Sequence, residues 1–335
     1  MPINPPSDND MPPLDSYALR AHQPDEETLA IAKGIDVTPV KAGEAIRLYH
    51  FTTSTCSQRV RLAAAEKQVR YESHMVNWLA FENITPAYLA INPRGVVPTW
   101  VDEGRAVFDS PTIARYIDAR YQGPALRPED PVSRAEVEAW VDAADAFPNR
   151  YLTYYQQYEL AGHSLDGVDF KPWADELQDR CAVAKKTHPA LASLYQSKID
   201  DFSSFFVELT NTGFMERCID LANRRLDELE AQLCKTPFIG GDAYTLADTC
   251  WTTALVRLES YHQYGKRVWF DASFRPALTD YVERIKRRPS FAAAYVDYFQ
   301  GLPQLLTGAE PPLIIERFNR LAHMYDDYAR PDTNL

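Results

Sequence analysis

Between Ile46 and Arg61, a short strand pattern passes straight into a helical one through a turn of small, mostly hydroxyl-bearing residues. Ile46–Phe51 alternates aliphatic and aromatic side chains, whereas Gln58–Lys67 is rich in Ala, Arg and Leu. A helix entered in this way leaves its first N–H groups without partners inside the helix. The stretch therefore predicts a βα unit whose helix start can face a ligand.

Cys56 lies at this predicted helix start. The partial positive charge of a helix N-terminus favours a thiolate over a thiol, and Arg59 and Arg61 are expected to act in the same direction. The alternative is structural, because a single cysteine is often a small buried hydrophobic residue. Cys56 is thus a candidate nucleophile that needs support from the rest of the chain.

Charge and cysteine content exclude several classes of function. The 335 residues hold 35 Lys and Arg against 47 Asp and Glu, a net charge of 35 − 47 = −12, without a densely basic stretch, so nucleic acid is not an expected partner. The five cysteines never form a CxxC pair, which predicts neither a disulfide framework nor a metal site. Without a long apolar run or a basic leader, we expect a soluble, cytoplasmic protein that does not engage membranes.

The chain is long enough for two domains with additional arms. We expect an N-terminal extension at 1–45, which is rich in proline and carries at most a short helix at Glu26–Lys33. A first domain is expected at 46–122, an all-helical domain at 123–305 and a C-terminal extension with one helix at 306–335.

The first domain reads as strand, helix, strand, helix, strand, strand, helix. Pro98 interrupts an apolar run and cannot donate to a central ladder, so it belongs at the first residue of a strand or in a special turn. Ser110 is predicted as the N-cap of the last helix, with Pro111 at its first position. The remaining elements are expected at Arg70–Val76, Thr85–Ile91 and Ala106–Phe108.

From Pro128 onward the patterns are helical. Val132–Tyr158 predicts one long helix unless Pro148 breaks it, and its tyrosines form either core or the wall of a cleft for a flat ring. Thr245 and Asp248 have the spacing of a capping box, which makes Asp248 structural. Further helices are expected at Ala190–Glu208, Glu216–Cys234, Arg275–Arg287, Ser290–Gln300 and Leu313–Tyr328.

Three motifs give the chain a resemblance to the soluble glutathione transferase superfamily: STCSQRVR at 54–61, NPRGVVPT at 92–99 and Asp109-Ser110. The resemblance implies an α/β thioredoxin-like domain (βαβ-ββα) followed by an all-α helical bundle, a homodimer, and glutathione as cosubstrate without a metal. It also implies a cis Pro98 that holds Val97 for pairing with the cysteinyl part of glutathione. By the same resemblance, Asp109 and Ser110 correspond to the acidic residue and serine that bind the γ-glutamyl end of glutathione.

The chemistry of glutathione agrees with this resemblance. Its amino-acid end needs an acid and a hydroxyl or amide, its spine needs a free strand edge, and its thiol needs positive potential. Asp109 can accept from the ammonium group, and the Ser110 N–H can meet the carboxylate. The structural alternatives are a solvated acid for Asp109 and a plain helix cap for Ser110.

With a cysteine at position 56, the chain resembles two groups in the superfamily. These are the zeta-class maleylacetoacetate or maleylpyruvate isomerases and the tetrachlorohydroquinone-type reductive dehalogenases. The stretches LYHFTTSTCS and AFENITPAYLAINPRGVVPT are more similar to the second group. That resemblance implies a small electrophilic aromatic substrate, a halogenated hydroquinone. It also implies glutathione held near Ser54 or Thr55, and a Cys56-glutathione mixed disulfide.

The substrate side is less defined. Tyr154 or Tyr155 is a candidate contact for the ring. The isomerases resembled here use an arginine shortly after the ADxC segment, where this chain has Ser260, with Arg257 about one turn earlier as the available cation. A third alternative is a non-catalytic interaction protein of the same fold, which the combined presence of Cys56, Pro98, Asp109 and Ser110 disfavours.

Overall fold

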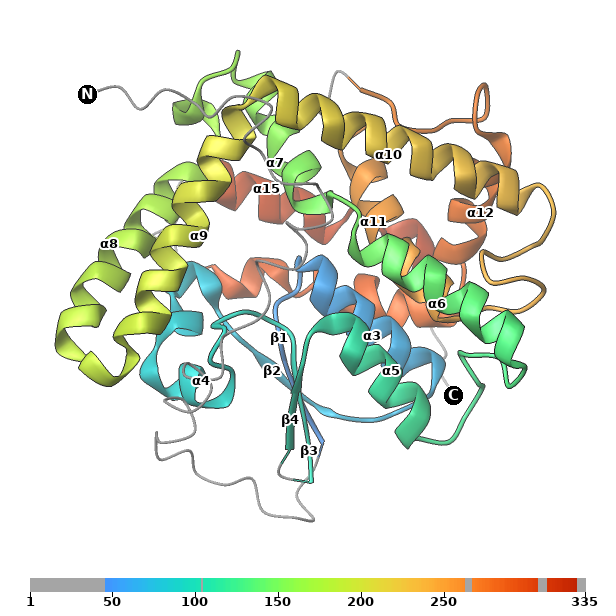
Figure 1. Ribbon diagram of the computed structural model, residues 1–335, viewed down its shortest axis with the longest axis horizontal. Coiled ribbons are helices and arrows are strands. Elements are labelled where there is room, and N and C mark those ends of the chain that lie inside the picture. Colours follow the sequence, from blue (N-terminus) through green and yellow to red (C-terminus); the bar gives the residue numbers. More distant parts are fainter. Residues whose placement is uncertain (1–45, 104, 263–266, 307–311, 330–335) are drawn as a thin grey trace.

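The computed structural model describes residues 46–103, 105–262, 267–306 and 312–329 (Figure 1). The predicted N-terminal extension, with its possible helix at Glu26–Lys33, lies outside the described residues. Over the described ranges, none of the helices is both long and apolar enough to cross a membrane.

A four-stranded sheet in the order β2-β1-β3-β4 forms the first part of the fold. β1 pairs parallel with β2 and antiparallel with β3, and β3 pairs antiparallel with β4. Figure 1 places α3 and α5 on one side of the sheet and α4 on the other. The elements are β1 (Arg47–His50), α3 (Thr55–Glu66), β2 (Glu72–Met75), α4 (Pro86–Ile91), β3 (Thr99–Asp102), β4 (Arg105–Phe108) and α5 (Ser110–Arg120).

Two features of this sheet concern the predicted ligand site. The Val97–Pro98 peptide bond is cis, as the resemblance implied, and β3 starts immediately after it. The prediction that Ser110 caps α5 is wrong by one residue. Asp109 is the cap, because its Oδ2 accepts from the Thr112 N–H at 3.2 Å and from the Thr112 hydroxyl at 2.6 Å.

The chain after α5 is mainly helical, which confirms the predicted fold class. Pro148 does break the predicted long helix, and α8 was not predicted because few of its side chains are buried and its apolar stripe is thin. The helices are α6 (Pro131–Asp145), α7 (Asn149–Leu160), α8 (Lys171–Thr187), α9 (Ala192–Thr210), α10 (Thr212–Leu233), α11 (Leu246–Ser260), α12 (Pro276–Lys286), α13 (Pro289–Phe291), α14 (Asp297–Phe299) and α15 (Pro312–Ala322). A π-helix, Ala292–Val296, separates α13 from α14.

Asp248 has the structural role that its spacing predicted. Its carboxylate is fully buried and completes the capping box of α11 with Thr245. It accepts from the Thr245 N–H at 2.8 Å, the Ile239 N–H at 2.9 Å and the Tyr281 hydroxyl at 2.8 Å. Asp248 therefore fixes the start of α11 and the loop before it.

Arg61 does not act on Cys56 as predicted, because its side chain points into the protein. Its guanidinium is 1 % exposed and donates to the carbonyl oxygens of Thr52 and Ala294, each at 2.8 Å. A residue two positions after Arg59 lies on a different face of the helix. Arg61 instead ties the loop between β1 and α3 to the π-helix of the C-terminal part.

His50 is buried beside Arg61 and should make the protein sensitive to acid. Its Nδ1 accepts from Arg61 Nη1 at 3.1 Å, so Nε2 carries the proton and donates to Ser73 Oγ at 2.7 Å. Burial, followed by the charges of Arg61 and His74, lowers the pKa of His50 from 6.5 to about 2. Below pH 6.5 the unfolded chain therefore takes up a proton that the native protein does not. The free energy of unfolding consequently decreases as the pH is lowered.

We expect wild type to lose about 2 kcal/mol more of its unfolding free energy than His50→Gln between pH 7.5 and pH 5. Urea denaturation at the two pH values measures this difference. His188→Gln is the matched control, because it makes the same replacement at an exposed histidine. Equal pH dependence in wild type and His50→Gln would contradict the assignment.

Candidate active site

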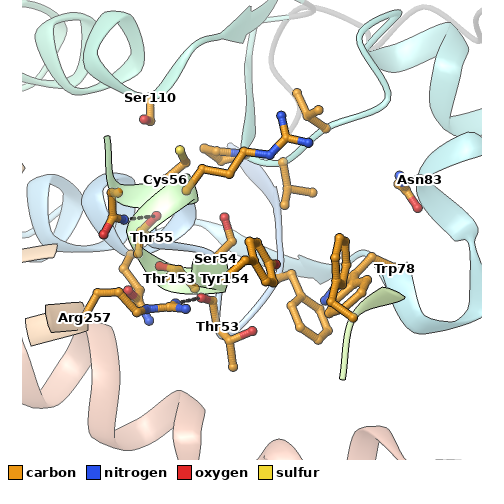
Figure 2. A pocket seen from close by; sticks show the side chains of 18 of the residues that line it. Thr53, Ser54, Thr55, Cys56, Trp78, Asn83, Ser110, Thr153, Tyr154 and Arg257 are labelled. Atoms are coloured by element: carbon orange, nitrogen blue, oxygen red, sulfur yellow. Dashed lines mark hydrogen bonds between the residues drawn. The ribbon is translucent and has the colours of Figure 1, made fainter. Parts of the chain in front are cut away.

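A cavity of about 1350 Å³ lies between the sheet and the helices, and it is lined by residues from both parts of the chain. Its size exceeds the roughly 300–1,000 Å³ that is usual for one small ligand. Figure 2 shows its central region, where the start of α3 carries Ser54, Thr55 and Cys56. There is room in it for a tripeptide together with a second molecule.

The start of α3 brings the predicted thiol and both predicted hydroxyl groups to this cavity. Ser54 caps the helix by accepting from the Ser57 N–H at 3.2 Å, and Cys56 is the second helical residue and half-buried. Thr55 Oγ1 accepts from Asn149 Nδ2 of α7 at 3.3 Å. Among the described residues, the Ser54 O–H has no acceptor, so it can donate to a ligand.

Cys56 differs from the other cysteines in its access to the cavity, since none of the others lines it. Burial raises the pKa of the Cys181 and Cys250 thiols to about 11 and that of Cys218 to about 12. Cys234 is exposed on the surface. Cys56 is therefore the thiol that a ligand in the cavity can meet.

Arg59 lies one turn after Cys56 and connects three elements. Its Nη1 donates to Ser110 Oγ of α5 at 3.1 Å and to Asp145 Oδ1 of α6 at 3.2 Å. Although burial opposes it, the neighbouring Cys250, Cys56 and Asp145 raise the pKa of Arg59. The Arg59 guanidinium is thus held by Ser110 and Asp145 one turn after Cys56, and both residues line the cavity.

The residues predicted for glutathione also line the cavity: Val97, Pro98, Asp109 and Ser110. Among the described residues, the N–H and C=O groups of Val97 have no hydrogen-bond partner, so this edge is free to pair with a peptide. Ser110 is the first residue of α5, and its N–H likewise has no partner there. Val97 and Ser110, whose amides are free, therefore line the same cavity as Cys56.

An aromatic wall made of Phe81, Tyr154, Phe170 and Trp173 lines the cavity on another side. Tyr154 stacks on Phe170 at 4.7 Å between centroids, Phe170 stacks on Trp173 at 4.8 Å, and Trp173 stacks on Phe81 at 5.3 Å. Such a surface favours a flat, weakly polar ring.

The two predicted tyrosines have different positions. Tyr154 belongs to the aromatic wall, whereas Tyr155 is not among the residues that line the cavity. Consecutive helical residues point about 100° apart, and Tyr155 lies against Tyr158 instead, 5.9 Å between ring centroids. Arg257 does line the cavity and donates to the Thr53 carbonyl, as Figure 2 shows.

Sequence reasoning missed the contributions of α8 and α15 to the cavity. Trp173 comes from α8, and Arg317, Phe318 and Leu321 come from α15. Nothing in the local pattern of these helices marks them as part of a site, because their position depends on packing against distant segments.

Comparison with known proteins agrees with this geometry. Residues 53–120 match the family model of the glutathione S-transferase N-terminal domain, and 213–284 match that of the C-terminal domain. A tetrachloro-p-hydroquinone reductive dehalogenase from Sphingobium chlorophenolicum is 34 % identical over 260 residues, which cover 75 % of this chain and 96 % of that protein. A maleylacetoacetate isomerase from Pseudomonas aeruginosa is 46 % identical over 93 residues, 27 % of this chain and 44 % of that protein.

Among solved structures, the β-etherase LigF from Sphingobium sp. strain SYK-6 has the same fold, with a TM-score of 0.56 and 20 % identity. The match covers 75 % of this chain and 98 % of LigF. The fold, the two family models and a 34 % identical relative that spans three quarters of the chain lead to one conclusion. The chain belongs to the glutathione S-transferase family and is an enzyme of that superfamily.

Proposed function

We propose that this enzyme removes halogen reductively from a halogenated hydroquinone with two molecules of glutathione. The observation that carries the proposal is the position of Cys56, which is half-buried at the cavity in the first turn of α3, one turn before Arg59. A hydroxyl at this place could only stabilise the thiolate of glutathione. A cysteine can also form a disulfide with it.

In the proposed complex, glutathione lies along Val97 with its γ-glutamyl end at Asp109 and Ser110. The free N–H and C=O groups of Val97 suit its peptide spine, and the free Ser110 N–H at the start of α5 suits its carboxylate. The Asp109 carboxylate already accepts from Thr112, and it keeps lone pairs for the ammonium group. The Ser54 and Thr55 hydroxyls are then available to the sulfur.

The first stage forms a conjugate. The glutathione thiolate attacks the halogen-bearing ring carbon of the keto tautomer, a C–S bond forms, and halide leaves with the C–X electron pair. The aromatic wall holds the ring during this stage through stacking.

The second stage reduces the ring. The Cys56 thiolate attacks the sulfur of the conjugate, the C–S bond breaks, and its electron pair stays on the ring carbon, which takes a proton. A second glutathione thiolate then attacks the mixed disulfide, which releases glutathione disulfide and restores Cys56. Two thiols are oxidised and one C–X bond becomes C–H, so the electrons balance.

The second candidate is a cis-trans isomerase acting on maleylacetoacetate or maleylpyruvate. Arg257 favours it, because this guanidinium lines the cavity and could hold a substrate carboxylate. The dehalogenase relative, however, matches 75 % of this chain, whereas the isomerase matches 27 %. Rapid isomerisation of a maleyl substrate without dehalogenation would decide for this candidate.

Mass spectrometry can test the proposal directly. Wild type incubated with tetrachlorohydroquinone and limiting glutathione should carry one glutathione as a mixed disulfide, located on Cys56 by peptide mapping. The expected adduct requires the aromatic substrate, because it forms from the conjugate.

Cys234→Ser is the matched control, since Cys234 is the exposed cysteine and can react with oxidants without any catalytic role. The adduct should persist in this variant. An adduct found on Cys234 alone, or one that forms equally well without substrate, would refute the second stage.

A further inference from the structure

We propose that Arg257, Tyr261 and Arg317 form an anion site that holds the ionised ring oxygen of the substrate. All three side chains line the cavity. This inference rests on the proposed function, because it assigns one atom of the proposed substrate to these residues. It also gives a role to α15, which lies outside both segments that match the family models.

Hydrogen bonds connect the cluster internally and to the loop before Cys56. Arg317 Nη2 donates to the Tyr261 hydroxyl oxygen at 2.6 Å. Arg257 is one turn before Tyr261 and donates to the carbonyl oxygen of Thr53, three residues before Cys56. The cluster is therefore adjacent to the loop that carries the reactive thiol, as the positions of Arg257 and Thr53 in Figure 2 show.

The cluster carries more positive than negative charge. Among the described residues, Arg257 has no carboxylate partner, and the one ion pair of Arg317, with Asp169 Oδ2, is long at 3.7 Å. Burial alone would raise the pKa of Tyr261, which is 6 % exposed, but Arg317 and Arg257 lower it below the usual value. Two partly buried guanidinium groups with one distant carboxylate leave positive potential that an anion in the cavity can neutralise.

Arg317 is held in position by aromatic residues that follow it in the chain. Phe318, the next residue, is 4 % exposed, and its ring centroid lies 6.3 Å from that of Phe51, at the start of the loop between β1 and α3. Tyr325, beyond the end of α15, is 5 % exposed and packs on Phe291, Tyr295 and Phe299. A guanidinium on an anchored helix can be preorganised for an oxyanion.

The reaction gives such a site a purpose. When the Cys56 thiolate takes the sulfur, the electron pair left on the ring carbon is delocalised onto the oxygen of the keto tautomer. A site that binds this oxygen more strongly as its charge grows lowers the barrier of the second stage. The chemical class selected is an aromatic ring that carries an oxyanion, next to the aromatic wall.

Ligand binding tests the site without any turnover. Pentachlorophenol at pH 8 is an anion, and pentachloroanisole is its uncharged methyl ether with the same chlorinated ring. Quenching of tryptophan fluorescence can report both, because Trp78 and Trp173 line the cavity. Wild type should bind the phenolate at least about tenfold more tightly than the ether.

In Arg317→Gln, we expect phenolate affinity to fall about tenfold while ether affinity changes less than about twofold. Arg317→Lys keeps the charge and should retain most of the preference. Arg320→Gln is the matched control, because Arg320 is an exposed arginine on the same helix and does not line the cavity. Its binding of both probes should equal that of wild type.

Three results would overturn the anion site. The first is equal affinity of wild type for the two probes, and the second is an equal loss of affinity for both probes in Arg317→Gln. The third is that maleate binds more tightly than pentachlorophenolate and displaces it from the cavity. The last result would identify a carboxylate site. Because the assay needs no reaction, a phenolate preference without dehalogenation would refute the proposed function and leave the site intact. Dehalogenation without a preference for the phenolate would refute the anion site and leave the proposed function intact.

Discussion

Replacing Cys56 by serine should stop the reaction at the conjugate. In Cys56→Ser, release of the reduced hydroquinone is expected to fall by about a thousandfold or more, because a serine hydroxyl is neither ionised at neutral pH nor able to take sulfur from carbon. Formation of the aryl-glutathione conjugate should change less than about threefold, since Ser54 and Thr55 remain. Chromatography of the products after a single turnover separates the two quantities.

The same experiment distinguishes two roles of the thiol. Loss of conjugate and of reduced product together would mean that Cys56 serves the first attack, as a simple activator of glutathione. Undiminished reduced product would mean that another group carries the second stage. Cys234→Ser, which removes an exposed thiol, should behave as wild type in both measurements.

The largest effect on stability is expected at Asp248. Asp248→Ala leaves the buried Ile239 and Thr245 N–H groups and the Tyr281 hydroxyl without their acceptor. At about 1–3 kcal/mol for each unsatisfied buried group, with some relaxation, we expect a loss of about 4 kcal/mol in the free energy of unfolding. Urea denaturation at pH 7 measures it.

Asp248→Asn is the informative partner of that variant. It keeps the volume of the side chain and one oxygen, but its NH₂ group cannot accept, so it should lose about half as much stability as Asp248→Ala. A loss below about 1 kcal/mol in Asp248→Ala would mean that the capping box does not stabilise α11 as described.

Local patterns were sufficient for the features that local chemistry determines. The start of α3, the strand after Pro98 and the capping box of α11 each depend on neighbouring residues, and each was predicted. The shift of the α5 cap from Ser110 to Asp109 is also local. Both residues can cap a helix, and the backbone of Asp109, with φ of 74°, decides which one does so.

Features that depend on distant contacts could not be read in this way. Arg59 and Arg61 look alike in the sequence, yet one meets Ser110 and Asp145 while the other meets Ala294. The position of Arg317 beside Tyr261 depends on where α15 packs, and no periodicity in its own sequence encodes that.

The loop before Cys56 is held from two sides by the C-terminal part of the chain. Arg257 of α11 donates to the Thr53 carbonyl, and Arg61 joins the Thr52 carbonyl to that of Ala294. Neither the N-terminal part with the sheet nor the C-terminal helical part is therefore expected to be replaceable on its own by the corresponding part of a relative. In a hybrid enzyme, the loop before Cys56 would keep its shape only if the new helical half supplied equivalents of both anchors. The sequences of the two parts are therefore expected to change together.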